Sequence, residues 1–202
     1  MLIKICGITT VDVAKVVSDS GANLLGFVFA PSKREITPDA ARDIAKSLPE
    51  HIQTVGVFVN ETIEKMTEIA ELVGLDYIQL HGDEDASIAA ALPYKIIKAF
   101  PVTTETLSLI QEYPADFYIL DSPIGGARGG NGTTFDWDLA ADLPIDKNKI
   151  ILAGGLHPDN VTVAIDRLNP IGIDVSSGVE TNGTKDHTKI KEFIHKIRQH
   201  NS

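Results

Sequence analysis

The sequence predicts a closed (β/α)8 barrel, because eight short β-rich runs alternate with helical patterns along 202 residues. The spacing gives roughly 25 residues per βα unit, near the lower size limit of that fold. Several runs, such as Leu24–Phe29, are continuously apolar, which is typical of parallel strands covered by helices on both faces. An open doubly wound sheet typically has about five or six strands, so the count favours closure. No linker divides the chain, and one domain over residues 1–202 is expected.

The predicted strands share short length and β-branched or aromatic content. They are Leu2–Cys6, Asn23–Phe29, Gln53–Val59, Asp76–Leu80, Lys95–Ala99, Asp116–Leu120, Lys149–Ala153 and Ile171–Val175. The gaps between them are too long for hairpins, and helical patterns fill them, as parallel crossovers require.

Capping residues and prolines mark the starts of several helices. The expected starts are Thr9 or Thr10, the pair Thr37-Pro38, Asn60 and Pro158. The helix after Asn60 is expected to end at Gly74, since glycine favours the left-handed C-cap. The last helix presents one apolar stripe, which consists of Ile190, Phe193, Ile194 and Ile197.

Composition excludes several classes of protein. With 43% hydrophobic and 23% charged residues the chain is too apolar for disorder. The formal net charge is −10, so the basic surface needed for non-specific nucleic-acid binding is missing, and no nucleic-acid partner is expected. No apolar run approaches the roughly 18–20 residues of a membrane helix. An anionic ligand would have to be met by backbone amides and a few placed cations.

Cysteine and histidine usage points to a cytoplasmic protein without a metal site. The one cysteine, Cys6, cannot form an intramolecular disulfide. A single cysteine also rules out the usual zinc patterns, and the six histidines show no HxH or HExxH spacing. The start of the chain turns polar too soon for a signal peptide.

The loops after the last two strands are candidates for binding a phosphate. In a parallel barrel the active site lies at the carboxyl ends of the strands, and a phosphate is often held by loops seven and eight. Glycines allow the backbone to approach a ligand, and successive N–H groups form an anion nest. Ordinary turn glycines are the alternative. The candidates are Gly154, Gly155, Ser176, Ser177 and Gly178.

Side chains at other strand ends could carry chemistry or bind a substrate. Cys6 could act as a base only as a thiolate, and a small buried side chain is the alternative. Asp121 follows an apolar run, where burial raises a carboxyl pKa and favours proton donation, although it could also be a cap. Arg34, His81 and Asp174 are candidate substrate-binding residues; for Arg34 the alternative is a solvated cation, and for His81 a hydrogen-bonded structural histidine.

The loop 122–134 contains five glycines, too many for a packed segment. It could be a lid that closes over a ligand or a floppy insertion. It lacks the spacing and the context of a dinucleotide-binding motif.

Taken in order, the motifs resemble those of the phosphoribosylanthranilate isomerases of tryptophan biosynthesis, over the whole chain. The KICGIT motif at Lys4–Thr9 is the most specific of them, whereas many phosphate-binding barrels share the glycine loops. The segments that carry the resemblance are Lys4–Thr9, Gln79–Gly82, Leu120–Ser122, Gly129–Gly132 with Phe135–Trp137, Leu152–Leu156 and Asp174–Glu180. One departure is Gly129-Gly130-Asn131-Gly132, where the family usually has GGTG.

The resemblance implies a cofactor-free Amadori rearrangement of a small phosphosugar, N-(5-phosphoribosyl)anthranilate, on a monomer or homodimer. The family's general base corresponds to Cys6 and its general acid to Asp121. The family's arginine that recognises the anthranilate carboxylate corresponds to Arg34, and the loops after strands seven and eight hold the phosphate.

Other phosphosugar barrels are the alternatives. A ribulose-phosphate epimerase would need metal-ligating His and Asp at strand ends, and only His81 fits. An indole-glycerol-phosphate synthase relies on catalytic lysines and a longer N-terminal segment. A non-catalytic phosphosugar sensor would not need Cys6 or Asp121.

Overall fold

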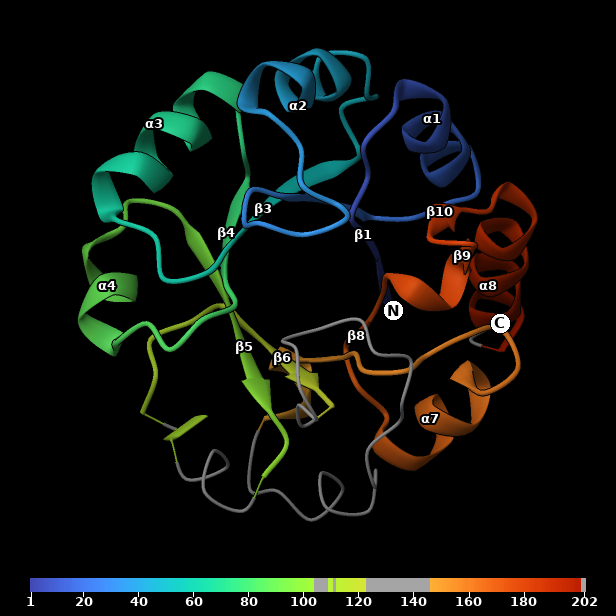
Figure 1. Cartoon of the computed structure of the whole chain (residues 1–202). Helices are drawn as coiled ribbons and strands as arrows, with labels where there is room; N and C mark the ends of the chain where they lie inside the picture. The colour runs from blue at the N-terminus through green and yellow to red at the C-terminus, as the bar shows by residue number, and fades with distance from the viewer. Residues whose placement is uncertain (104–108, 111, 123–145, 201–202) are drawn as a thin grey trace.

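In the computed structural model, which describes residues 1–103, 109–110, 112–122 and 146–200, eight parallel strands form a closed barrel. Strand β8 pairs with β1 to complete it, and helices surround the strands (Figure 1). The strands are β1 (Leu2–Cys6), β2 (Leu24–Val28), β3 (Gln53–Phe58), β4 (Tyr77–Leu80), β5 (Lys95–Pro101), β6 (Phe117–Asp121), β7 (Ile150–Leu152) and β8 (Gly172–Val175). The predicted barrel and each predicted strand are confirmed, with ends that differ by one or two residues.

The outer ring consists of helices that follow the strands in the chain. Those described are α1 (Val11–Asp19), α2 (Pro38–Ala45), α3 (Ile63–Val73), α4 (Ala86–Ala91), α7 (Val161–Leu168) and α8 (His187–His200), with 3-10 turns η1 (Lys147–Lys149) and η2 (Ser177–Val179). None of these helices combines the length and the apolar character that crossing a membrane requires. The glycine-rich segment 123–134, considered above as a lid, lies outside the described residues.

Two of the predicted helix starts are correct and two are wrong. Thr10 and Thr37 cap α1 and α2 with their side-chain oxygens. Helix α3 is capped by Thr62 rather than Asn60, because the Asn60 side chain accepts a bond from the Asp83 amide in the next loop. Pro158 opens a turn, and α7 starts only at Val161.

Gly74 ends α3 as predicted, in the left-handed conformation with φ 77°. The apolar stripe of the last helix is also confirmed, since all four of its residues are buried in α8.

The core has two parts, because successive side chains of a strand point to opposite faces. One cluster lies between the strands and the helices and contains most of the buried apolar residues. A smaller cluster fills the barrel and consists of Leu24, Val55, Tyr77, Ile97, Ala99, Ile119, Ile151 and Ala153. Other residues on the inner face are polar, among them Lys4, Gln79 and Asp174, all of them buried. The apolar cluster inside the barrel therefore lies next to several buried polar residues.

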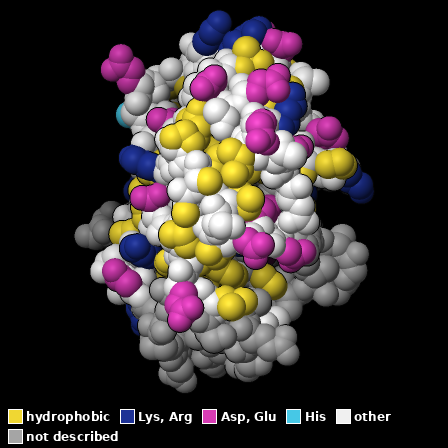
Figure 2. Space-filling model, turned by 90° about the vertical axis from the view of Figure 1, so that its left-hand side faces the viewer, with side chains coloured by type: hydrophobic (Ala, Val, Ile, Leu, Met, Phe, Trp, Pro, Cys, Tyr) yellow, Lys and Arg dark blue, Asp and Glu magenta, His cyan; other side chains and the backbone are white. Residues whose placement is uncertain are grey.

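The molecular surface reflects the acidic composition. Figure 2 shows the face on the left of Figure 1, where apolar side chains are interspersed with carboxylates and fewer cationic groups. Large apolar residues that are exposed, such as Leu72 on α3, are spaced along the chain.

Phe193 is expected to be a strong contributor to stability, because its side chain is fully buried between α8 and the barrel. Phe193→Ala should lower the free energy of unfolding by about 3–5 kcal/mol, through lost burial and the cavity left behind. Urea denaturation measures this. Val163→Ala, at a position that is 49% exposed, is the control and should change stability by no more than about 0.5 kcal/mol.

Candidate active site

One pocket at the carboxyl ends of the strands is lined by all ten candidate residues. They are Cys6, Arg34, His81, Asp121, Gly154, Gly155, Asp174, Ser176, Ser177 and Gly178. The remaining lining is mostly apolar, together with Gln79 and Ser32. Residues from loops far apart in sequence thus share one concave site, where ligands are usually bound in this architecture.

Cys6 ends β1, and its thiol is buried at the base of the pocket. Space for the sulfur comes from Gly26 on the neighbouring strand, where a side-chain carbon would lie 3.0 Å from Sγ. Burial raises the pKa of the Cys6 thiol, because desolvation disfavours the thiolate. The ammonium of Lys4 acts in the opposite direction and lowers that pKa.

Asp121 ends β6 and keeps its carboxyl mostly out of water. Burial raises its pKa to about 6, although the hydrogen bond that Oδ1 accepts from the Ser122 amide, at 2.8 Å, acts against this. The carboxyl can therefore hold a proton at a pH where an exposed aspartate would have lost it. This is the property that a proton donor needs.

His81 lies beside Asp121, with 3.6 Å between Nε2 and Oδ2. Burial lowers its pKa to about 4, so the ring is neutral at pH 7. The Gln79 amide nitrogen lies 2.9 Å from Nδ1. Gln79 and Asp121 thus contact the two ring nitrogens of His81, whose donor and acceptor roles depend on the tautomer.

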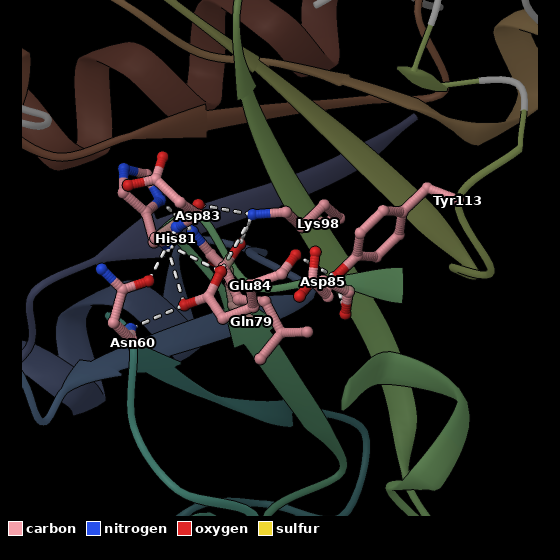
Figure 3. A network of polar contacts seen from close by, with 10 residues as sticks. Asn60, Gln79, His81, Asp83, Glu84, Asp85, Lys98 and Tyr113 are labelled. Atoms are coloured by element: carbon pink, nitrogen blue, oxygen red, sulfur yellow. Dashed lines mark hydrogen bonds and ion pairs between the residues drawn. The ribbon is translucent and has the colours of Figure 1, made fainter. Parts of the chain in front are cut away.

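The loop that carries His81 is held by a buried ion pair (Figure 3). Lys98 Nζ lies 2.9 Å from Glu84 Oε2 and donates to the Gly82 carbonyl at 2.6 Å. The other Glu84 oxygen accepts from the amides of Asn60 and Gly82, at 2.8 and 2.9 Å. These bonds tie the loops after β3 and β4 together directly behind His81.

Arg34, predicted to bind a carboxylate, is paired with a carboxylate of the protein itself. Its Nε and Nη2 donate to the two oxygens of Glu180, at 2.7 and 2.9 Å. Lys185 Nζ donates to the same carboxylate at 2.6 Å and to the Ser176 carbonyl at 2.9 Å. Gly7 allows the close approach of Arg34, because a side chain there would overlap the arginine stem.

Glu180 and Lys185 face each other across a small hairpin that the sequence analysis missed. Strands β9 (Glu180–Thr181) and β10 (Thr184–Lys185) are joined by Asn182-Gly183, both at positive φ. Asn-Gly at such a turn is a strong hairpin signal, so this element was predictable from the sequence.

The two candidate phosphate loops approach each other closely. Gly154 and Gly155 have φ of 76° and 61°, which favours glycine. A side-chain carbon at Gly178 would overlap the carbonyl of Leu156. The loop after β8 can therefore pass over the loop after β7 only if residue 178 is glycine. Ser176 donates through its hydroxyl to the Cys6 carbonyl at 3.1 Å, which links loop eight to β1.

Lys4 and Gln79 are polar residues of this region that were not among the candidates. Each precedes a candidate by two positions, Cys6 and His81 respectively, and so shares its strand face. This two-residue spacing is the sequence signal that could have identified Lys4 and Gln79 as residues of the site. Within the described residues, no group of three or more His, Cys, Asp or Glu is arranged to hold a metal ion.

Known proteins resemble this chain over nearly its whole length. The model of the N-(5'-phosphoribosyl)anthranilate (PRA) isomerase family matches residues 3–196. An N-(5'-phosphoribosyl)anthranilate isomerase of Oceanobacillus iheyensis is 50% identical over 200 residues, covering 98% of each chain.

Solved structures show the same similarity. The phosphoribosyl anthranilate isomerase of Thermotoga maritima is 40% identical with a TM-score of 0.89, over 98% of this chain and 100% of that one. Another, determined in complex with reduced 1-(o-carboxyphenylamino)-1-deoxyribulose 5-phosphate, is 39% identical with a TM-score of 0.85, at the same coverage. With half of its residues identical to a curated relative over nearly its full length, the chain belongs to the phosphoribosylanthranilate isomerase family.

Proposed function

We propose that this chain isomerises N-(5'-phosphoribosyl)anthranilate in tryptophan biosynthesis, with Cys6 as general base and Asp121 as general acid. The observation that carries the proposal is the shared pocket. Strands β1 and β6, which are not neighbours in the barrel, bring a thiol and a carboxyl to one cavity that two glycine loops border.

Asp121 performs the first proton transfer in this scheme. In its protonated form it donates to the ring oxygen of the furanose, and the ring opens to an iminium ion. The raised pKa supports this role, because it keeps a fraction of the carboxyl protonated near neutral pH.

Cys6 performs the second transfer. Its thiolate removes the proton on C2', which the adjacent iminium has acidified, and the enolamine that forms tautomerises to the ketone. The iminium nitrogen of the substrate accepts the electron pair, so the reaction needs no cofactor and no net redox change.

The two ends of the substrate would be held by different parts of the pocket. Amides of the glycine loops and the 3-10 turn after Ser176 suit the phosphate. Arg34 suits the anthranilate carboxylate, because its bonds to Glu180 use two of the five N–H donors of a guanidinium. His81 and Asp174 line the space between and suit the ribose hydroxyls.

A cytoplasmic location and a monomeric or homodimeric assembly are part of the same proposal. The lone cysteine gives the fold no need of an oxidising compartment.

Removing either proposed proton-transfer group should abolish most activity while the fold remains. Cys6→Ala and Asp121→Asn should each lower kcat by about 10²–10⁴-fold or more, the usual contribution of general acid–base catalysis. Turnover is measured from the fluorescence of freshly prepared substrate, with EDTA present. Asp39→Asn, at an exposed position, is the matched control, and normal turnover in either active-site variant would remove that residue from its role.

The pH dependence of kcat/KM is expected to be bell-shaped with its acidic limb near pH 6. The active form needs protonated Asp121, whose pKa is about 6, together with Cys6 thiolate, whose pKa is raised above its ordinary value. Between the two pKa values the fraction of enzyme with protonated Asp121 and ionised Cys6 is small and independent of pH. Outside them this fraction declines. A profile that falls steadily from pH 6 to 8 would contradict the requirement for a thiolate.

Asp121 should reduce the stability of the free enzyme at neutral pH. Its folded-state pKa of about 6 lies above the ordinary 3.8, so ionisation costs more in the folded state, and the cost grows as pH rises between these values. Asp121→Asn should therefore raise the free energy of unfolding by about 1–3 kcal/mol at pH 8 and by little at pH 4. Urea denaturation at both pH values tests this, and equal differences at the two would contradict the raised pKa.

A further inference from the structure

Lys4 is a buried cation that the proposed mechanism does not yet use. Its side chain is 0% exposed, on the inner face of β1, two residues before Cys6. A fully buried lysine is rare unless it is paired. Its partner is Asp174, which lies opposite in the register of β1 and β8, with 3.0 Å between Nζ and Oδ1.

The Lys4 ammonium and the Cys6 sulfur both lie next to Gly26 on β2. A side-chain carbon at Gly26 would lie 3.0 Å from Cys6 Sγ and 3.3 Å from Lys4 Nζ. The absence of a side chain on β2 thus leaves one space that both atoms border, and the positive charge of the ammonium lowers the pKa of the thiol there.

Three other charged groups face the Cys6 thiol from neighbouring elements: Asp174 on β8, Lys185 on β10 and Arg34 in the loop after β2. Lys185 and Arg34 share the Glu180 carboxylate, which offsets much of their positive charge. Among the cations near the thiol, Lys4 has the largest effect on its pKa, and it borders the same glycine as the sulfur.

A thiolate in this position needs a counterion. Burial disfavours any isolated charge by several kcal/mol, and only a close opposite charge or hydrogen bonds recover that cost. In water a thiolate would be solvated, but Cys6 is buried among the strand ends. The buried ammonium is a fixed donor that can replace water.

We propose that Lys4 is a positioning residue that stabilises the Cys6 thiolate relative to the thiol, and that Asp174 tethers the ammonium in place. The catalytic consequence rests on the proposed function, since it matters for turnover only if Cys6 is the base. The electrostatic claim itself concerns the free enzyme.

Asp174 has two opposing effects on Cys6. It orients Lys4, but its own negative charge disfavours the thiolate. Removing Lys4 and removing Asp174 should therefore shift the titration of the thiol in opposite directions. A residue that only supported packing would not produce this pattern.

The single cysteine of the chain makes the test direct, because alkylation by iodoacetamide reports Cys6 alone. The pH dependence of the alkylation rate, without substrate, gives the pKa of the thiol. Lys4→Met should raise it and slow alkylation at pH 8 by about tenfold or more, one pKa unit being a factor of ten. Asp174→Asn should lower the pKa and speed alkylation. Lys98→Met is the matched control, because Lys98 is also buried and ion-paired but bonds to Glu84 and Gly82; it should leave the alkylation profile unchanged.

The proposal is overturned if the folded Lys4→Met variant titrates like the parent, or if both variants shift the thiol in the same direction. If Lys4→Met does not fold, as judged by near-UV circular dichroism, Lys4→Gln replaces it, and a thiol that titrates like that of the parent overturns the proposal. Activity in Cys6→Ala would refute the proposed base without changing these titrations, so the two failures are distinguishable.

Discussion

The pairing of β8 with β1 is the constraint on which the site depends. It closes the barrel, and its register sets Lys4 beside Asp174. Because Cys6 lies two residues beyond Lys4 on the same face, this closure also fixes the sulfur at the base of the pocket. Phosphate loop eight continues directly from β8, and the Ser176 hydroxyl bonds to the Cys6 carbonyl. The pairing of β8 with β1 thus places both the proposed catalytic thiol and the candidate phosphate loop.

Glycine is required where main chains or side chains must approach closely, and these points surround the pocket. Gly26 leaves room for the Cys6 sulfur, and Gly178 lets loop eight pass the Leu156 carbonyl. Gly154 adjoins the Asp121 carboxyl, where a side-chain carbon would lie 3.1 Å from Oδ1. A pocket built from strand ends can be small enough for one phosphosugar because these positions carry no side chain.

The charges of the site are paired, and the pairs differ in what they do. Lys98 on β5 pairs with Glu84 in the loop after β4, and together they fix the loop that carries His81. Glu180 joins Arg34 to Lys185 and so holds the rim of the pocket to the β9–β10 hairpin. Lys4 and Asp174 lie inside the barrel, next to the proposed general base Cys6. Among the described residues no Lys or Arg forms an ion pair with Asp121, and burial is the dominant influence on its pKa. The difference between these environments raises the pKa of Asp121, whereas the pKa values of the paired Glu84 and Glu180 are lowered.

The sequence by itself determined the barrel, the strand ends and therefore the candidate residues, because apolar runs, caps and glycines are local signals. It also contained two signals that were not among the predictions. These are the Asn182-Gly183 turn, which indicates the hairpin, and the two-residue spacing of Lys4 and Cys6, which indicates a shared strand face. Only the tertiary structure decided the partners. Asn60 was expected to cap a helix but bonds to the next loop, and Arg34 pairs with a carboxylate 146 residues away. Such contacts depend on how closure brings distant loops together, and no local pattern encodes a distance between loops.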